Sequence, residues 1–338
     1  MSSISSAMSS VEGKAISIGD CPCCGENNST HWLWVPDRAT YWMQVPDRSH
    51  RGTDGHDLLR CSSCSHVWLG NRPTPEEMSF YYGEGYHQAV GSTGEMSPKR
   101  WTRQLEVISK YKSGGDILDI GCSSGGFLAR LKDGPWKLYG VEADLPTAER
   151  ARSLTGADVF AGDVLDANFR PNSFDVITCS DVLEHLYEPR AIFRRVYTWL
   201  KPGGIFYVFV PNIMSWEARL FGSYWIALDV PRHLHHFSKK SLANLAMSVS
   251  LRQVRLVTPR GSYVEHSASI LLDDLLRRAG VRRTKPLNLT GEAGLGWRVV
   301  RKGWRLSVEA LYSTAAFCCG AAPSIQAVFQ KDAGSIQQ

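Results

Sequence analysis

The chain has 338 residues and no long hydrophobic run. No window reaches the eighteen or so uninterrupted apolar residues that a membrane-spanning helix needs. The first twenty residues are rich in serine and lack both the basic start and the apolar stretch of a secretory signal, so we interpret residues 1–20 as a disordered leader. These absences favour a cytoplasmic protein, in which the nine cysteines stay reduced and serve as metal ligands or buried apolar groups.

Acidic residues are scarce in one segment only. Residues 277–305 contain nine Lys and Arg but a single acid, Glu292, which gives this segment a net charge of +8 in a chain of net charge +5. A local basic patch therefore describes the protein better than a generally basic surface. Hydrophobic content of 43% and charged content of 21% are those of an ordinary globular protein large enough for one main domain and one or two smaller ones.

Short apolar runs alternate with amphipathic stretches over most of the chain, which is typical of parallel β/α units. The runs predict seven strands, with helices between them at 125–133, 188–200 and 238–249; the strands are 117–121, 138–143, 158–163, 175–180, 205–211, 253–259 and 325–330. Seven strands with helices on both faces predict an α/β, doubly wound, Rossmann-like sheet. An insertion at 262–323, before the last strand, is expected to be mainly helical.

Differences in amino-acid composition divide the chain into an amino-terminal segment, a linking segment, a main domain and a tail. Residues 21–75 are rich in Cys, His, Trp and Pro and show turn chemistry with little helical periodicity. Residues 76–115 predict a linking segment with a helix from about 98 to 111. The main domain is then expected at 116–331, with a tail at 332–338.

The stretch DILDIGCSSGGFL, residues 116–128, predicts a strand, a tight turn and a helix, so its loop should lie at the carboxyl edge of the sheet where such folds bind ligands. Gly121, Gly125 and Gly126 let a ligand approach the backbone. Asp119 argues against a dinucleotide, because its carboxylate would face a pyrophosphate. A ligand with ammonium and sulfonium groups, such as S-adenosylmethionine, would be attracted by the same carboxylate.

Two further acids follow at the ends of the next strands. Glu142 lies where an acid can accept hydrogen bonds from both ribose hydroxyls. Asp163 offers a polar partner for an adenine amino group, and Val164 beside it offers an apolar contact for the ring. The ordered set is a stronger signal than a glycine loop alone.

The chain resembles the class I S-adenosylmethionine-dependent methyltransferases. The matching motifs are DIGCSSGGF at 119–127, YGVEAD at 139–144, GDV at 162–164, FDVITCSDVLEHL at 174–186 and LKPGG at 200–204. The resemblance implies a cofactor site made by Asp119, Gly121, Ser123, Gly125, Glu142, Asp163, Val164 and Ser180. This chain departs from the family pattern at Ser123, where a glycine is usual.

Two Cys-x-x-Cys pairs, Cys21 with Cys24 and Cys61 with Cys64, can supply four thiolates to a structural zinc ion. Cys23 is the spare residue of this arrangement, and free thiols or a redox pair are the alternative interpretations. The other cysteines, Cys122, Cys179, Cys318 and Cys319, are interpreted as core residues. A zinc ribbon before a methyltransferase core resembles bacterial methyltransferases of surface-glycan and natural-product pathways, which suggests a glycan or small-molecule acceptor.

Methyl transfer to a hydroxyl needs alignment of the reactants and a group that takes the acceptor proton. His185, in the motif after the fourth strand, is the first candidate for this general base, and capping of the next helix is its structural alternative. The segment LDVPRHLHHFSKKSL, 228–242, supplies the second candidate, His236, which we favour slightly over His233. Ser238 in the same segment is a plausible helix N-cap.

Other functions remain open at this point. Carbon methylation of a nucleotide-linked deoxysugar, methylation of ribosomal RNA through the basic segment, and a non-catalytic cofactor-binding scaffold are the alternatives. The fourth strand lacks the Asn-Pro-Pro-aromatic sequence of many base-amine methylators, so a nucleic-acid partner is not expected. A basic amphipathic helix at 296–312 can contact an anionic membrane face peripherally, although a lid packed on the core is the simpler interpretation.

Overall fold

A computed structural model describes residues 16–17, 20–36, 55–82, 98–281, 307 and 309–333. Nearly all of the predicted leader and tail lies outside these residues. So do residues 83–97 of the linking segment and most of the predicted basic helix at 296–312. Within the described residues, no helix is long and apolar enough to cross a membrane.

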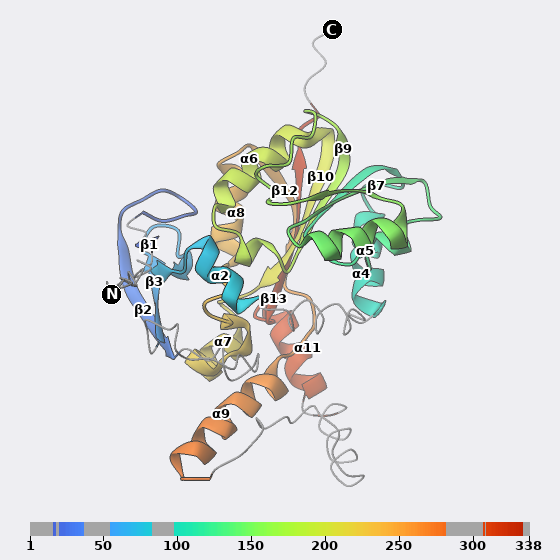
Figure 1. Ribbon diagram of the computed structural model, residues 1–338. Helices are drawn as coiled ribbons and strands as arrows, with labels where there is room; N and C mark the ends of the chain where they lie inside the picture. The colour runs from blue at the N-terminus through green and yellow to red at the C-terminus, as the bar shows by residue number, and fades with distance from the viewer. Residues whose placement is uncertain are drawn as a thin grey trace, which may run out of the picture.

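The main domain is built on a seven-stranded sheet of order β12-β13-β10-β9-β6-β7-β8 (Figure 1). Its strands, all predicted from the sequence to within a few residues, are β6 Gly115–Ile120, β7 Trp136–Glu142, β8 Asp158–Ala161, β9 Phe174–Ser180, β10 Leu200–Pro211, β12 Leu251–Val257 and β13 Ser324–Lys331. Strands β8, β7, β6, β9 and β10 pair in parallel, and β13 runs antiparallel between β10 and β12. The predicted doubly wound sheet is therefore confirmed.

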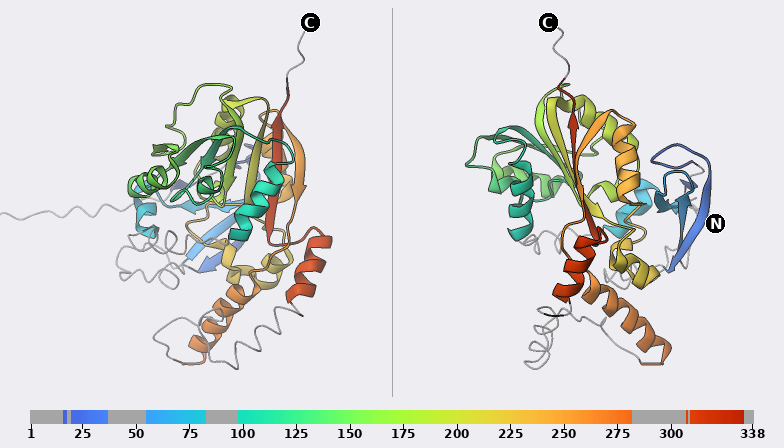
Figure 2. Two further views of the ribbon diagram at one scale, coloured as in Figure 1. Left: turned by 90° about the vertical axis from the view of Figure 1, so that its right-hand side faces the viewer. Right: turned by 180° about the vertical axis from the view of Figure 1, so that it is seen from behind.

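Helices cover both faces of the sheet because their apolar sides need a partner surface. Helices α4 (Pro98–Ile108) and α5 (Leu145–Thr155) lie on one side, and α6 (Pro189–Trp199) and α8 (Lys239–Met247) lie on the other (Figures 1 and 2). Ser238 caps α8 as predicted, since its hydroxyl accepts a hydrogen bond from the Ser241 backbone N–H.

The sequence predicts an α-helix at 125–133, and this prediction is wrong. This segment forms one 3₁₀ turn, η1 Leu128–Arg130, in which most backbone hydrogen bonds join residues three apart. Gly126 packs closely against the ring of Trp101, so a side chain at this position would clash with that ring.

The amino-terminal part forms a second sheet of order β11-β4-β3-β2, with strands β2 Ser29–Pro36, β3 Gly55–Cys61, β4 Val67–Leu69 and β11 His235–His236. The fourth strand, β11, comes from the segment that the sequence places in a loop of the methyltransferase domain. A short pair, β1 Ile16–Ser17 with β5 Asn71–Arg72, and helix α2 Pro75–Tyr81 complete this part.

The two parts share one hydrophobic core. Trp68 of β4 and Phe237, next to β11, are fully buried in the same cluster as Leu242 of α8 and Val208 of β10. The amino-terminal sheet is thus packed onto the α6 and α8 side of the molecule, as Figure 1 also shows.

Three further helices, α7 Trp216–Phe221, α9 Val264–Arg278 and α11 Ala310–Cys318, lie beyond the end of the sheet at which β10 ends (Figure 1). Two of them fall in the insertion that was expected to be helical. Cys122 and Cys179 are buried as predicted, but Cys318 and Cys319 are exposed. The core interpretation of these two cysteines is wrong, because they lie at the end of α11 on the surface.

Candidate active site

The glycine loop leaves β6 in the conformation that its sequence requires. Gly121 and Gly125 have φ of +72° and +84°, and a Cβ atom at Gly121 would overlap the side chain of Val182. Ser123 also adopts a left-handed backbone, with φ of 48°. Glycine adopts this conformation freely, whereas serine adopts the turn at some conformational cost.

Glu142 at the end of β7 holds the loop in place. Its carboxylate accepts hydrogen bonds from the backbone N–H of Ser123, at 2.9 Å, and of Asp144, at 3.1 Å. Each carboxylate oxygen keeps a second lone pair. The geometry is compatible with the predicted hydrogen bonds to ribose hydroxyls.

Asp119 of β6 is buried beside β9. Thr178 Oγ1 donates a hydrogen bond to Asp119 Oδ1 at 2.5 Å. Burial raises the pKa of Asp119 to about 7, although the Thr178 hydroxyl opposes this shift. The carboxyl therefore changes charge near neutral pH, and a cationic ligand would favour its ionised form.

The remaining predicted cofactor residues, Asp163, Val164 and Ser180, lie at or just beyond the ends of β8 and β9. Asp163 Oδ1 accepts a hydrogen bond from the Leu165 backbone N–H at 2.7 Å, beyond the end of β8. The Ser180 hydroxyl, at the end of β9, lies 3.3 Å from Gln104 Oε1 of α4. Val164 is only 4% exposed and packs in the main core, so its surface for an adenine ring is small.

Sequence reasoning missed two polar residues at this edge of the sheet. Arg100 of α4 forms an ion pair with Asp181, and its guanidinium lies 4.6 Å from the centre of the Phe209 ring. Thr178 holds Asp119. A threonine within the otherwise apolar run of β9 was a weak signal for Thr178. Nothing near Arg100 in the sequence points to the site, because α4 lies in a segment interpreted as a linker.

A cluster of histidines and one acid follows β9. The 3₁₀ turn η2, Leu183–His185, brings Glu184 and His185 together, and the 228–238 segment adds His233, whose ring centre is 4.5 Å from that of His185. One ligand atom from each of these three side chains lies within 4.8 Å of the others. Burial and then the neighbouring His233 lower the pKa of His185 to about 3, so its imidazole is neutral.

His236 lies deeper in the molecule. It is 2% exposed, belongs to β11, and its ring centre is 6.4 Å from that of His233. Burial lowers its pKa to about 3 as well. The two predicted bases thus belong to one group of histidines, but only His185 shares the cluster with Glu184.

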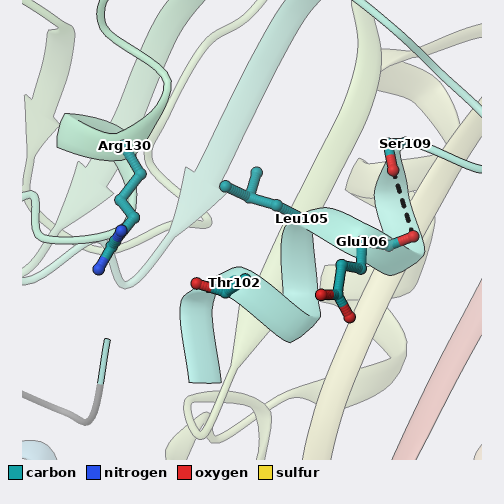
Figure 3. A pocket seen from close by; sticks show the side chains of 5 residues that line it. All are labelled: Thr102, Leu105, Glu106, Ser109 and Arg130. Carbon is teal, nitrogen blue, oxygen red and sulfur yellow. Dashed lines mark hydrogen bonds between the residues drawn. The ribbon is translucent and has the colours of Figure 1, made fainter. Parts of the chain in front are cut away.

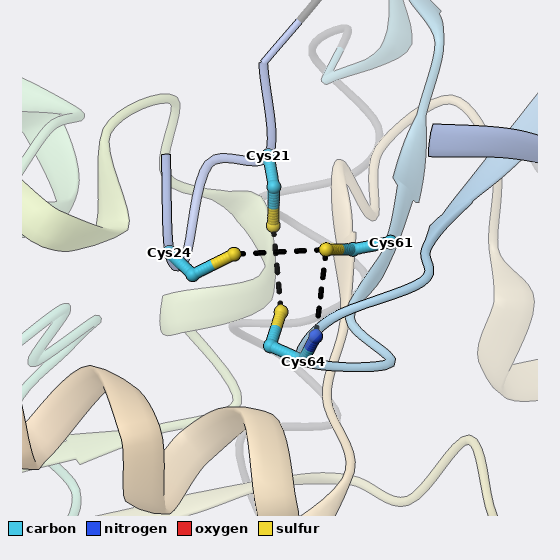
Figure 4. Close-up of side chains that lie close together, drawn as sticks. All are labelled: Cys21, Cys24, Cys61 and Cys64. Atoms are coloured by element: carbon cyan, nitrogen blue, oxygen red, sulfur yellow. Dashed lines mark hydrogen bonds between the residues drawn. The ribbon is translucent and has the colours of Figure 1, made fainter. Parts of the chain in front are cut away.

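The four predicted zinc ligands converge (Figure 4). The sulfur atoms of Cys21 and Cys64 are 3.5 Å apart, and those of Cys24 and Cys61 are 3.6 Å apart. Sulfur atoms at the corners of a tetrahedron around zinc, each about 2.3 Å from the metal, would be roughly 3.8 Å apart. The donor set therefore fits a zinc ion.

A separate hollow of about 450 Å³ lies against the outer face of α4 (Figure 3). It is lined by Thr102, Leu105, Glu106, Ser109 and Arg130. None of the predicted site residues lines it, and it has only one pair of charged side chains. We assign the active site to the edge of the sheet and not to this hollow.

The fold and this edge define an α/β methyltransferase. The family model described as "Methyltransferase domain" matches residues 94–253. The chain is 31% identical over 216 residues to the ubiquinone biosynthesis O-methyltransferase of Paraburkholderia phytofirmans, covering 59% of this chain and 84% of that protein. It is 29% identical over 215 residues to the enzyme of the same name from Paraburkholderia xenovorans, with the same coverage.

Solved structures are also similar. A phosphoethanolamine N-methyltransferase 2 of Haemonchus contortus in complex with S-adenosyl-L-methionine is 16% identical, with a TM-score of 0.47, and the match covers 90% of this chain and 68% of that chain. The 31% identity to the Paraburkholderia phytofirmans enzyme, over 84% of that protein, shows that this chain belongs to the family of S-adenosylmethionine-dependent methyltransferases.

Proposed function

We propose that this methyltransferase acts on a hydroxyl group of a saccharide or a related small metabolite. The observation that carries the proposal is the group formed by Glu184, His185 and His233 directly after β9, because hydroxyl methylation needs polar groups that handle a proton beside the methyl donor. The two Paraburkholderia relatives are O-methyltransferases by name, which supports a hydroxyl acceptor. The resemblance of the cysteine-rich segment to glycan-pathway enzymes supports the saccharide class.

The reaction is a displacement at the methyl carbon. A lone pair of the acceptor oxygen forms the new C–O bond while the C–S bond breaks, the sulfur keeps that electron pair, and the acceptor proton leaves. The protein aligns oxygen, carbon and sulfur. We propose that Asp119, Gly121, Ser123, Gly125, Glu142, Asp163, Val164 and Ser180 hold the donor.

We propose that His185, and not His236, promotes the loss of the acceptor proton. His185 lies in the cluster at the carboxyl end of β9, whereas His236 is paired in β11 with strand β4 of the other sheet. Neutral imidazole with a pKa of about 3 is a weak base at pH 7, so His185 needs a partner to promote deprotonation.

We also propose that Cys21, Cys24, Cys61 and Cys64 hold one structural zinc ion, because four sulfur ligands close the coordination shell and leave no position for a substrate.

The test of the acceptor uses the full chain with ¹³C- and ¹⁴C-methyl-labelled cofactor and separate pools of glycans, small metabolites and RNA. We expect label in the first two pools, with a ¹³C signal typical of an O-methyl group. His185→Gln should lower the rate by about 100-fold or more, whereas His31→Gln, at an exposed position near the start of β2, should not.

Label found only in RNA, or a ¹³C signal typical of a C-methyl group, would overturn this function. Cofactor binding without turnover on any pool would instead support a non-catalytic scaffold.

A further inference from the structure

We propose that Glu184, His185 and His233 bind a divalent transition-metal cation at the carboxyl end of β9. The three side chains come from two segments far apart in the sequence and converge on one point, with ligand atoms within 4.8 Å of one another. Two imidazoles and one carboxylate are a donor set that suits such ions.

Each imidazole is oriented by a backbone carbonyl. His185 Nδ1 lies 3.1 Å from the carbonyl oxygen of Arg232, and His233 Nδ1 lies 2.9 Å from that of Ala227. A carbonyl oxygen only accepts hydrogen bonds, so both Nδ1 atoms carry the proton and both Nε2 atoms present a lone pair. This second contact is typical of metal-bound histidines, because it fixes the tautomer and the ring orientation.

Tyr82, at the end of α2, adds a second contact. Its hydroxyl oxygen lies 2.8 Å from the same Nδ1 of His185. The side of His185 that faces Tyr82 and Arg232 is therefore occupied, and Nε2 is the atom available to an ion.

The carboxylate of Glu184 gives the independent indication of a ligand. The residue is 1% exposed, and neither oxygen has a hydrogen-bond partner among the described residues. A buried carboxylate without a partner is costly, and either a proton or a cation must satisfy it. A cation between Glu184 and two neutral imidazoles would meet this requirement.

The charges around the cluster also favour a cation. Asp229 Oδ2 lies 3.7 Å from His233 Nε2, and the other Asp229 oxygen pairs with Arg232 at 2.6 Å. Asp181 is paired with Arg100. With these two pairs neutral overall, an ionised Glu184 would carry an uncompensated charge, and the ion would supply the balance.

Three protein ligands leave coordination positions for water or substrate, as in catalytic metal sites. The ion's chemical role rests on the proposed function, whereas its binding does not. An acceptor hydroxyl that coordinates the ion through oxygen loses its proton to solvent more readily, and its oxygen then attacks the methyl carbon. His185 would in that case act as a ligand, which removes the difficulty of its low basicity.

The test uses full-length protein whose cysteine site is already loaded with zinc, and Co²⁺ as the probe. Native mass spectrometry should show one cobalt ion in addition to the zinc ion. X-ray absorption at the cobalt edge should show nitrogen and oxygen ligands including imidazole, with no sulfur. This measurement on the wild-type protein does not depend on whether a variant folds.

Glu184→Gln and His233→Gln should each weaken Co²⁺ binding by at least about tenfold. His236→Gln is the matched control, because it removes a buried histidine of the same group that lies outside the three ligands, and it should leave Co²⁺ affinity unchanged. Thermal melts identify any variant that fails to fold.

Absence of a second ion, cobalt bound only by sulfur, or equal loss of affinity in His236→Gln would overturn the proposal. Methylation that persists in the protein freed of the second ion would also overturn the ion's catalytic role while leaving the proposed function intact. Cobalt bound as expected without any methylated acceptor would leave the metal site standing and count against the proposed function.

Discussion

The cofactor loop depends on a few residues that combine backbone and charge requirements. Glu142 accepts two backbone hydrogen bonds, from Ser123 and Asp144, so the residue predicted to bind the ribose also fixes the strained turn at Ser123. A substitution at this position affects both roles. The hydrogen bond from the Ser123 backbone N–H to Glu142 helps to hold serine in this left-handed turn.

Glu142→Gln tests the predicted ribose contact. The amide keeps the size of the side chain and one accepting oxygen but loses the charge. We expect the affinity for S-adenosylhomocysteine to fall by roughly tenfold or more, since hydrogen bonds to a charged group contribute about 1.5–3 kcal/mol. Isothermal titration calorimetry measures the change.

Glu149→Gln is the matched control, because Glu149 is exposed on α5, the helix that follows β7. Equal affinity of the wild-type protein and Glu142→Gln, with both variants folded, would remove Glu142 from the cofactor site.

A side-chain hydrogen bond connects β6 and β9 in addition to their backbone pairing. The Thr178 hydroxyl of β9 donates this bond to the buried Asp119 carboxyl of β6. The pKa of Asp119 is raised from its ordinary value of 3.8 to about 7. Between these two values the native state holds a proton that the unfolded state has lost. The contribution of Asp119 to the free energy of unfolding therefore falls as the pH rises from about 4 to about 7.

Asp119→Asn should remove this dependence. Relative to the variant, the wild-type protein should lose roughly 2 kcal/mol of unfolding free energy between pH 5 and pH 8, with about 1.4 kcal/mol per pH unit as the upper limit of the slope. Urea denaturation of both proteins across this pH range measures the difference.

Thr178→Val provides the second comparison. It removes the hydroxyl that lowers the pKa of Asp119, so the pH-dependent interval should extend to higher pH. A wild-type protein and an Asp119→Asn variant with parallel pH profiles would show that Asp119 is ionised alike in both states.

The sequence predicted the elements whose pattern is local. The seven strands are short apolar runs bounded by turn residues, and the end of each strand marks its loop, so Asp119 and Glu142 could be located from the pattern. The helix at 125–133 was wrong because the apolar period of this segment does not distinguish an α-helix from the short 3₁₀ turn that forms there. Strand β11 was missed because two residues, His235–His236, form a strand only through pairing with β4, which is distant in the sequence.

The candidate site could be predicted from the sequence only where its residues belong to a local motif. Motif spacing identified His185 and the four cysteines, but the packing of Arg100 against Phe209 and the approach of Tyr82 to His185 join segments that are far apart in the sequence. Such contacts leave no local pattern. Only the folded arrangement shows that His233, and not His236, stands beside His185 and Glu184.

At the scale of the whole molecule, the cysteine-rich part and the histidine cluster are connected by a short chain of hydrogen bonds. The Leu69 backbone N–H of β4 donates to Leu234 at 3.0 Å, and the Leu234 N–H donates to the Glu184 carbonyl at 2.8 Å. Arg72 and Tyr187 add reciprocal contacts, since Arg72 donates to the Tyr187 carbonyl at 2.7 Å and Tyr187 donates to Pro73 at 3.0 Å.

Loss of the proposed zinc ion should therefore loosen the active site as well as the cysteine-rich part. In Cys61→Ser, we expect faster amide hydrogen exchange at Leu69 and Leu234, because β4 follows directly on the second cysteine pair and holds β11 in place. The Gly121 N–H, which donates to the Val141 carbonyl inside the main sheet, should keep the protection that it has in the wild-type protein. Exchange followed by mass spectrometry resolves these segments.

Cys23→Ala separates the effect of zinc from that of a perturbed core. Cys23 is buried like Cys21, Cys61 and Cys64 but lies outside the four proposed ligands, so this variant should retain one zinc ion and the protection of Leu234. Faster exchange at Leu69 alone would mean that the β11 segment holds its place without the cysteine-rich part. Because the Glu184 carbonyl accepts a hydrogen bond from the Leu234 N–H, exchange at Leu234 shows whether the proposed zinc site and the proposed catalytic cluster belong to a single cooperative unit.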